Sequence, residues 1–242
     1  MRNKISNRFY ILSLIPFIFS TFHTQLCRAQ AEPGVKLSVT DKYTLYKKQV
    51  QRDSTKKMIE LKTLVPNLVY DLRYATINNF THRLMYPQKT TVTFLRLPVA
   101  LALQKAQHEL NGKGFGLKIF DAYRPYSVTV KFWELVKDER YVANPVKGSG
   151  HNRGIAVDLT IINLKTGEEL NMGTGFDNFT DTAHQTFTHL PEEILQNRQL
   201  LRSTMERYGF NAFETEWWHY FFKDGEKFEV LDIDFKKLRK GR

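Results

Sequence analysis

Apolar positions recur at helical spacing in three segments of the chain. Residues 97–114, LPVALALQKAQHELNGKG, carry a proline in the first turn and a glycine near the end, which are typical of helix boundaries. Residues 191–209, PEEILQNRQLLRSTMERYG, begin with a proline and two glutamates and end in a glycine. Residues 127–140 are a shorter amphipathic segment, with Ser127 as a candidate N-cap. We predict a helix at each.

Alternating and continuous apolar runs predict the strands. Alternate positions are apolar at the start of residues 115–125, so we predict a strand that ends in a loop. Residues 154–162, GIAVDLTII, are too apolar for an edge and predict a central strand. Residues 67–81 indicate a strand followed by an irregular loop. Residues 213–223 and 227–235 are predicted to pair with each other around the sequence DGE.

The order of these elements decides the fold class. Several strands follow one another directly, whereas parallel crossover units would alternate strand and helix. We therefore expect an α+β fold with an antiparallel or mixed central sheet and helices packed against it. The 242 residues, 42% of them hydrophobic, contain no repeat and no linker rich in Pro, Gly or Ser, which suits a single domain.

The beginning of the chain differs from the rest. A basic start, MRNKISNRFY, precedes the apolar residues 9–22, which are fewer than the roughly 20 that a membrane-spanning helix needs. Together with the small-residue pattern AQA at 29–31, this predicts a signal peptide at 1–31 and a mature domain at 32–242. We expect no stable membrane insertion after cleavage.

Cys27 is the only cysteine of the sequence, and it lies in the predicted signal peptide. The mature chain therefore forms no internal disulfide, and an exported chain without cysteine indicates a bacterial periplasm. Lipid attachment at Cys27 is the alternative, although Thr24 and Leu26 fit the lipoprotein pattern poorly.

The formal net charge of +11 overstates the basicity of the mature chain. The first 29 residues hold four basic residues and no acid, so the mature charge is +7. Nucleic-acid binding requires a basic stripe with interleaved aromatic residues, but here the basic residues are scattered. We expect no nucleic-acid partner.

The sequence SGHNRGIAVDLT places His151 and Asp158 at the two ends of a glycine-containing turn into the central strand. A catalytic zinc site takes three protein ligands and keeps a position for water. The sequence EWWHY offers His219 as a third ligand, with Glu216 three residues before it. A carboxylate beside the metal is the base that a zinc-activated water needs.

These patterns leave other interpretations open. One alternative is that His151 caps a turn while Asp158 accepts backbone hydrogen bonds, and EWWH also suits an aromatic core strand. His184 and His189, in DTAHQTFTHL, compete with His219 for the third position. Residue pattern alone does not decide between a zinc enzyme and a structural role for these residues.

Several separated motifs resemble those of the zinc D-alanyl-D-alanine dipeptidases, which are related in fold to the D,D-carboxypeptidases and the hedgehog signalling domain. Between residues 66 and 236 the motifs are RYATINNFT, FDAYRP, SGHNRGIAVDLT, NMGTGFD, QNRQLLRSTMERYGF and EWWHY, in that order. The resemblance implies a metallopeptidase with one zinc ion per chain that hydrolyses the dipeptide D-Ala-D-Ala to two D-alanines.

The resemblance also implies roles for individual residues. Carried over by motif, the metal ligands fall on His151, Asp158 and His219, and the general base falls on Glu216. The arginine of the YRP motif, which stabilises the transition state, falls on Arg124. The residues that anchor the substrate fall on Tyr74, Ser149 and Asp177.

Two departures from the family pattern concern the rim of the pocket. Gly150 stands directly before the first ligand, where a less specified residue is expected, and the interval from Arg124 to His151 is shorter than in the resistance enzymes. We expect both to affect the substrate range and not the metal.

Two other functions fit parts of the pattern. A D,D-carboxypeptidase acting on peptidoglycan stem peptides would share the zinc chemistry, but an acid such as Asp177 on the amine side of the cleft favours a dipeptidase. A non-catalytic zinc-containing envelope-binding module would have no use for Glu216 as a base. Export favours salvage of D-alanine from wall turnover as the role.

Overall fold

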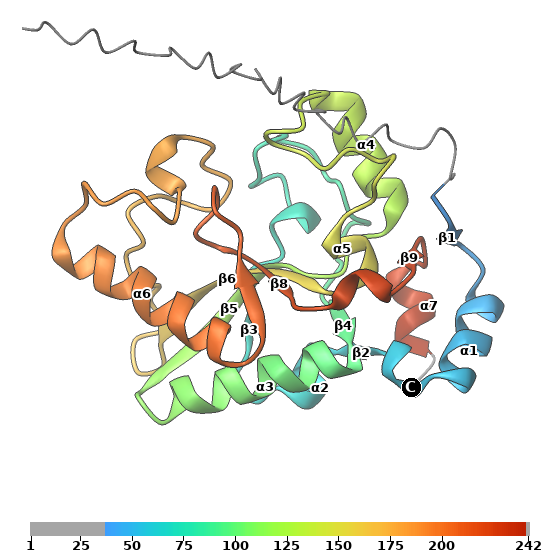
Figure 1. The fold of residues 1–242 in the computed structure, drawn as a ribbon, viewed down its shortest axis with the longest axis horizontal. Coiled ribbons are helices and arrows are strands. Elements are labelled where there is room, and N and C mark those ends of the chain that lie inside the picture. The colour runs from blue at the N-terminus through green and yellow to red at the C-terminus, as the bar shows by residue number, and fades with distance from the viewer. Residues whose placement is uncertain (1–36, 241–242) are drawn as a thin grey trace, which may run out of the picture. The chain divides into compact units, whose positions relative to one another are not determined.

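The computed structural model describes residues 37–240, so the predicted signal peptide and Cys27 lie outside the described residues. The described residues contain nine strands and seven α-helices, and Figure 1 labels all of them except β7. The chain is an α+β fold with a mixed sheet, as the element order predicts. Among residues 37–240, no helix combines the length and the apolar character that crossing a membrane requires.

The central sheet has five strands in the order β3–β5–β6–β8–β7. Its strands are β3 (Val69–Tyr70), β5 (Phe115–Asp121), β6 (Ala156–Asn163), β7 (Phe210–Ala212) and β8 (His219–Phe222). Only β3 and β5 pair in parallel; the other pairs are antiparallel. Strand β6 lies in the middle and is buried at every position except its last, which confirms the predicted central strand.

Helices cover this sheet and its flanks (Figure 1). They are α1 (Tyr43–Arg52), α2 (Leu61–Leu64), α3 (Leu97–Asn111), α4 (Tyr126–Val136), α5 (Gly150–Arg153), α6 (Glu192–Arg207) and α7 (Phe235–Lys240). Helix α3 packs on β5 and on α6, which in turn packs on β7. The predicted helices at 97–114 and 191–209 are therefore confirmed, with slightly shorter bounds.

Helix α4 begins and ends earlier than the sequence predicts. Its N-cap is Pro125 and not Ser127. The Ser127 amide and hydroxyl both donate to Oδ1 of Asp232, at 3.0 and 2.8 Å, so a distant carboxylate satisfies the exposed N-terminus. The helix stops before Lys137, which adopts a left-handed conformation with φ 51°.

The predicted pairing of residues 213–223 with 227–235 is wrong. Strand β8 pairs with β6 and β7, whereas β9 (Val230–Leu231) pairs with β1 (Val39–Thr40) in a separate parallel pair. A 3-10 turn at Gly225–Lys227 follows β8, in place of a tight hairpin turn, and the chain leaves the sheet.

A second small sheet, β2 (Met58–Glu60) with β4 (Phe94–Arg96), brings the buried Arg96 beneath α5. The Arg96 guanidinium donates to the carbonyl oxygens of Lys56 at 2.6 Å, Arg153 at 2.8 Å and Glu229 at 2.9 Å. One side chain therefore joins the C-terminal end of α5 to two segments distant in sequence, which stabilises α5 on the sheet.

Candidate functional site

Three chemically active side chains lie in a row across the central sheet. Asp121 of β5 is the register partner of Asp158 of β6, which is the partner of His219 of β8. Directly opposite residues on one sheet face have Cβ atoms about 4.5–5.5 Å apart, so strand pairing alone brings these side chains together. His219 Nδ1 lies 2.8 Å from Asp158 Oδ1.

His151 reaches the row from α5, a single helical turn. Ser149 caps this turn, because its Oγ accepts from the Asn152 amide while the Asn152 side chain accepts from the Ser149 amide. His151 Nδ1 lies 2.7 Å from the carbonyl oxygen of Ala122. We assign the proton to Nδ1, which leaves Nε2 free as a ligand, 3.4 Å from Asp158 Oδ2.

The glycine before His151 has a packing reason. A Cβ at Gly150 would lie 2.9 Å from the Cβ of Ala156, closer than side chains normally approach. Glycine therefore lets α5 sit directly against the start of β6, and this contact fixes the height of His151 above the sheet.

His151, Asp158 and His219 offer ligand atoms that all lie within 4.8 Å of one another. Within residues 37–240, no other group of three or more His, Cys, Asp or Glu residues brings its ligand atoms this close together. Burial lowers the pKa of both histidines, so each is neutral, the form that binds a metal. Two imidazoles and a carboxylate match the donor set of catalytic zinc. The cluster includes neither His184 nor His189.

Glu216 lies beside this cluster and outside it. Its Oε2 is 3.8 Å from His219 Nδ1. Burial raises the pKa of Glu216 to about 7, with the Asp158 charge adding to the rise while His219 opposes it. A carboxylate with a pKa near neutrality is suited both to accept and to return a proton.

Arg124 is held rigidly at the edge of the site. Its Nε and Nη2 donate to Oδ2 of Asp121 at 3.1 and 2.8 Å. The fully buried Asp121 also accepts hydrogen bonds from the Tyr86 hydroxyl and the Ala122 amide. The ring of Phe132 packs against the guanidinium, with its centroid 4.8 Å from Cζ of Arg124. Sequence reasoning missed Asp121 as the residue that orients Arg124, although the acid stands in the FDAYRP motif.

Tyr74, whose ring centroid lies 5.1 Å from Cζ of Arg124, and Asp177 form another part of the cavity wall. The Tyr74 hydroxyl lies 3.1 and 3.2 Å from the two carboxylate oxygens of Asp177. Burial raises the pKa of Asp177 well above its usual value, and the charge of Asp158 raises it further. This carboxylate has a neutral hydroxyl partner and no cation among its hydrogen bonds in the described structure, so a ligand cation would stabilise its ionised form.

The segment that carries Asp177 is fixed by a buried arginine of α6. The guanidinium of Arg198 donates to the carbonyl oxygens of Met172 at 2.8 Å, Thr182 at 2.8 Å and His184 at 3.1 Å. Sequence reasoning also missed this residue, although it lies in the QNRQLL motif.

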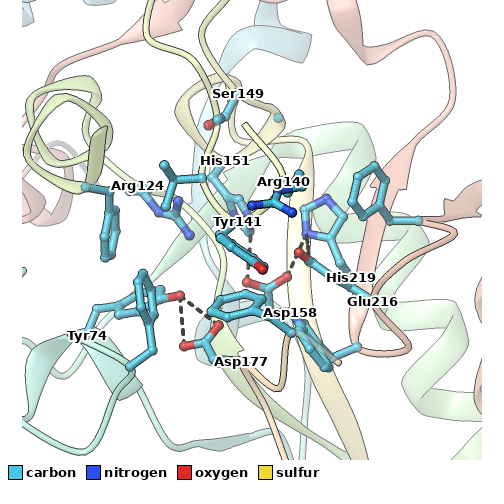
Figure 2. Close-up of a pocket in the computed structure, with 18 of the residues that line it drawn as sticks. Tyr74, Arg124, Arg140, Tyr141, Ser149, His151, Asp158, Asp177, Glu216 and His219 are labelled. Atoms are coloured by element: carbon cyan, nitrogen blue, oxygen red, sulfur yellow. Dashed lines mark hydrogen bonds and ion pairs between the residues drawn. The ribbon is translucent and has the colours of Figure 1, made fainter. Parts of the chain in front are cut away.

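All eight sequence-predicted site residues line one cavity of about 250 Å³ (Figure 2). Pockets for drug-sized ligands have volumes of about 300–1,000 Å³, so this cavity suits a smaller molecule. Arg140 and Tyr141, on the segment between α4 and α5, also line it and were not predicted.

The comparisons with known proteins agree with the motifs. The family model described as D-ala-D-ala dipeptidase matches residues 54–237. A D-alanyl-D-alanine dipeptidase from Escherichia coli is 32% identical, covering 75% of this chain and 92% of that protein. A D-alanyl-D-alanine dipeptidase from Enterococcus faecalis is 36% identical, and the match covers 62% of this chain and 84% of that protein. The solved structure "VanYB in complex with D-Alanine-D-Alanine" is 17% identical, covers 58% of this chain and 77% of that chain, and has a TM-score of 0.37.

Proposed function

Because the chain belongs to the D-Ala-D-Ala dipeptidase family of metallopeptidases, we propose that it hydrolyses D-Ala-D-Ala to two D-alanines, with one zinc ion per chain. The observation that carries the proposal is the metal-binding geometry of His151, Asp158 and His219, with Glu216 adjacent. These four residues supply the ligands and the base that hydrolysis of a peptide bond at a metal requires.

Each residue has a distinct task in the proposed reaction. Zinc bound by the three ligands would lower the pKa of a water molecule and polarise the peptide carbonyl. Glu216 accepts the proton of the attacking water and later delivers a proton to the leaving amine. Arg124, held by Asp121, faces the carbonyl oxygen as it gains negative charge, so it stabilises the transition state more than the bound substrate.

Selection of a free dipeptide is assigned to Asp177. A methyl group contributes only about 1–3 kcal/mol of discrimination, so the two alanine side chains alone do not define the substrate. The ammonium of the substrate pairs with the half-buried Asp177 carboxylate, oriented by Tyr74. An acylated amine lacks this charge and leaves Asp177 unpaired, which disfavours the stem peptides that a carboxypeptidase takes.

The Asp177→Asn variant tests this assignment. We expect it to lower kcat/KM for D-Ala-D-Ala by about 100-fold, since one member of a hydrogen-bonded charge pair inside the cavity is lost. The kcat/KM for N-acetyl-D-Ala-D-Ala, which we expect to be low in the unmodified enzyme, should fall much less. The ratio of the two kcat/KM values, which measures the preference for a free amine, therefore shrinks. Asp181→Asn is the matched control, because that carboxylate lies in the same segment and is 92% exposed. An unchanged preference in Asp177→Asn would contradict the assignment.

For the cell, we propose that residues 1–31 are removed on export and that the mature enzyme works in the periplasm, salvaging D-alanine from wall turnover. Support comes from the basic start, the apolar residues 9–22 and the AQA pattern. N-terminal sequencing of the exported protein tests this: a start between residues 30 and 32 agrees, and an intact Met1 contradicts it. Lipid at Cys27 would instead indicate an anchored enzyme.

A further inference from the structure

Arg140 lies between α4 and α5 and lines the same cavity as the proposed catalytic residues. In Figure 2 its guanidinium projects across the cavity, displaced from the Tyr74–Asp177 pair toward the side of Ser149 and His219. The proposed function gives this side chain no role so far.

The charges around the cavity leave one group of the substrate unmatched. A dipeptide carries an ammonium and a carboxylate, and Asp177 accounts for the ammonium. Ser149 offers only a neutral hydroxyl, which accepts a hydrogen bond from the Asn152 amide as a helix cap and keeps a single O–H to donate. A positively charged partner would bind the carboxylate of the second alanine more strongly than a neutral hydroxyl does.

Among the described residues that line the cavity, the lysines and arginines number two, Arg124 and Arg140. Each pairs with a carboxylate through Nε and Nη2, Arg124 with Asp121 and Arg140 with Asp138, so this pairing does not distinguish them. Arg124, however, is only 8% exposed and faces the carbonyl oxygen in the proposed reaction. Arg140 is therefore the cation that remains for the terminal carboxylate.

Asp138 holds Arg140 in an orientation that leaves part of the guanidinium available. Arg140 Nε lies 3.0 and 3.1 Å from the two Asp138 oxygens, and Nη2 lies 2.6 Å from Oδ2. Its Nη1 has no hydrogen-bond partner among residues 37–240, and the side chain is 76% exposed. A second carboxylate can therefore bind to the guanidinium without displacing Asp138.

The other acid of this segment does not compete. Glu139 also lines the cavity, but its carboxylate accepts from Asn144 Nδ2 at 2.7 Å and from Lys147 Nζ at 3.1 Å. Lys147 thus compensates the Glu139 charge, as Asp138 compensates that of Arg140, so neither acid of this segment takes up the remaining Nη1 donors of Arg140.

We propose that Arg140 binds the terminal carboxylate of the substrate, so that the enzyme selects a free carboxylate at one end as Asp177 selects a free ammonium at the other. This inference deepens the proposed dipeptidase function and rests on it. It makes Arg140 a specificity-determining residue that excludes peptides extended beyond the second alanine.

The test compares D-Ala-D-Ala with D-Ala-D-Ala amide, whose C-terminus is neutral. In Arg140→Met we expect KM for the free acid to rise about three- to fivefold, the effect of losing one ion pair in a solvent-exposed site, while kcat changes little. The kcat and KM for D-Ala-D-Ala amide should stay the same, so the preference of the enzyme for the free acid over the amide falls. Arg140→Lys should restore part of this preference, because lysine returns the positive charge but lacks the planar guanidinium that binds a carboxylate through two parallel hydrogen bonds.

Arg83→Met is the matched control, since Arg83 is exposed and does not line the cavity. If Arg140→Met keeps the acid-to-amide preference of the unmodified enzyme, the Arg140 inference is overturned while the dipeptidase function stands. If the unmodified enzyme, loaded with zinc, cleaves neither substrate, the proposed function fails and the inference falls with it.

Discussion

Replacing Glu216 by glutamine is expected to lower the turnover of D-Ala-D-Ala by about 10²–10⁴-fold, the usual contribution of a general base. Glutamine has nearly the same shape, but it does not accept the proton of the attacking water. Glu216 lies outside the ligand cluster, so zinc content and thermal stability should stay close to those of the unmodified enzyme. D-alanine release gives the rate, and metal analysis of the same sample gives the zinc content.

Glu214→Gln is the control for this measurement. Glu214 stands two residues before Glu216 and has the same side chain, but it is exposed and does not line the cavity. It should retain full turnover. Near-normal turnover in Glu216→Gln, with zinc confirmed, would show that Glu216 is structural and that another group accepts the proton.

Replacing His219 by alanine is expected to abolish tight zinc binding and, with it, activity. The change leaves two protein ligands and removes the nitrogen that lies 2.8 Å from Asp158 Oδ1. The β6–β8 pairing uses backbone groups, so the sheet should persist. Zinc per chain, measured after dialysis against a weak chelator, checks the outcome together with a circular dichroism spectrum.

The two competing histidines are the controls for the metal assignment. His184→Ala and His189→Ala should both keep zinc, because neither residue belongs to the cluster. Full zinc retention in His219→Ala, with loss in either of the other two variants, would overturn the ligand assignment.

Elements with a strong periodic or continuous apolar pattern could be predicted from the sequence. Helices α3 and α6 each bury one face, and β6 is buried on both faces, so their patterns are unambiguous. The ligand candidates were also visible, because His151 and Asp158 flank a turn into that central strand. What could not be derived is the register that places His219 opposite Asp158, since it depends on segments 61 residues apart.

The errors have the same physical origin. A strand pattern does not name its partner, so β8 and β9 were paired with each other when their partners lie elsewhere in the chain. The N-terminus of α4 is satisfied by Asp232, 105 residues away from Ser127, which no local capping rule anticipates. Arg140 looks like an ordinary surface residue in the sequence, and only the course of its segment brings it to the cavity.

The central claim is hydrolysis of a free dipeptide at the site that His151, Asp158, His219 and Glu216 form. The most direct test incubates purified, zinc-loaded residues 32–242 with D-Ala-D-Ala and, separately, with N-acetyl-D-Ala-D-Ala, and measures D-alanine release. We predict rapid release from the free dipeptide and very slow release from the acetylated one, because acetylation removes the charge that pairs with Asp177. Equal cleavage of both would contradict the dipeptidase function and indicate a D,D-carboxypeptidase instead.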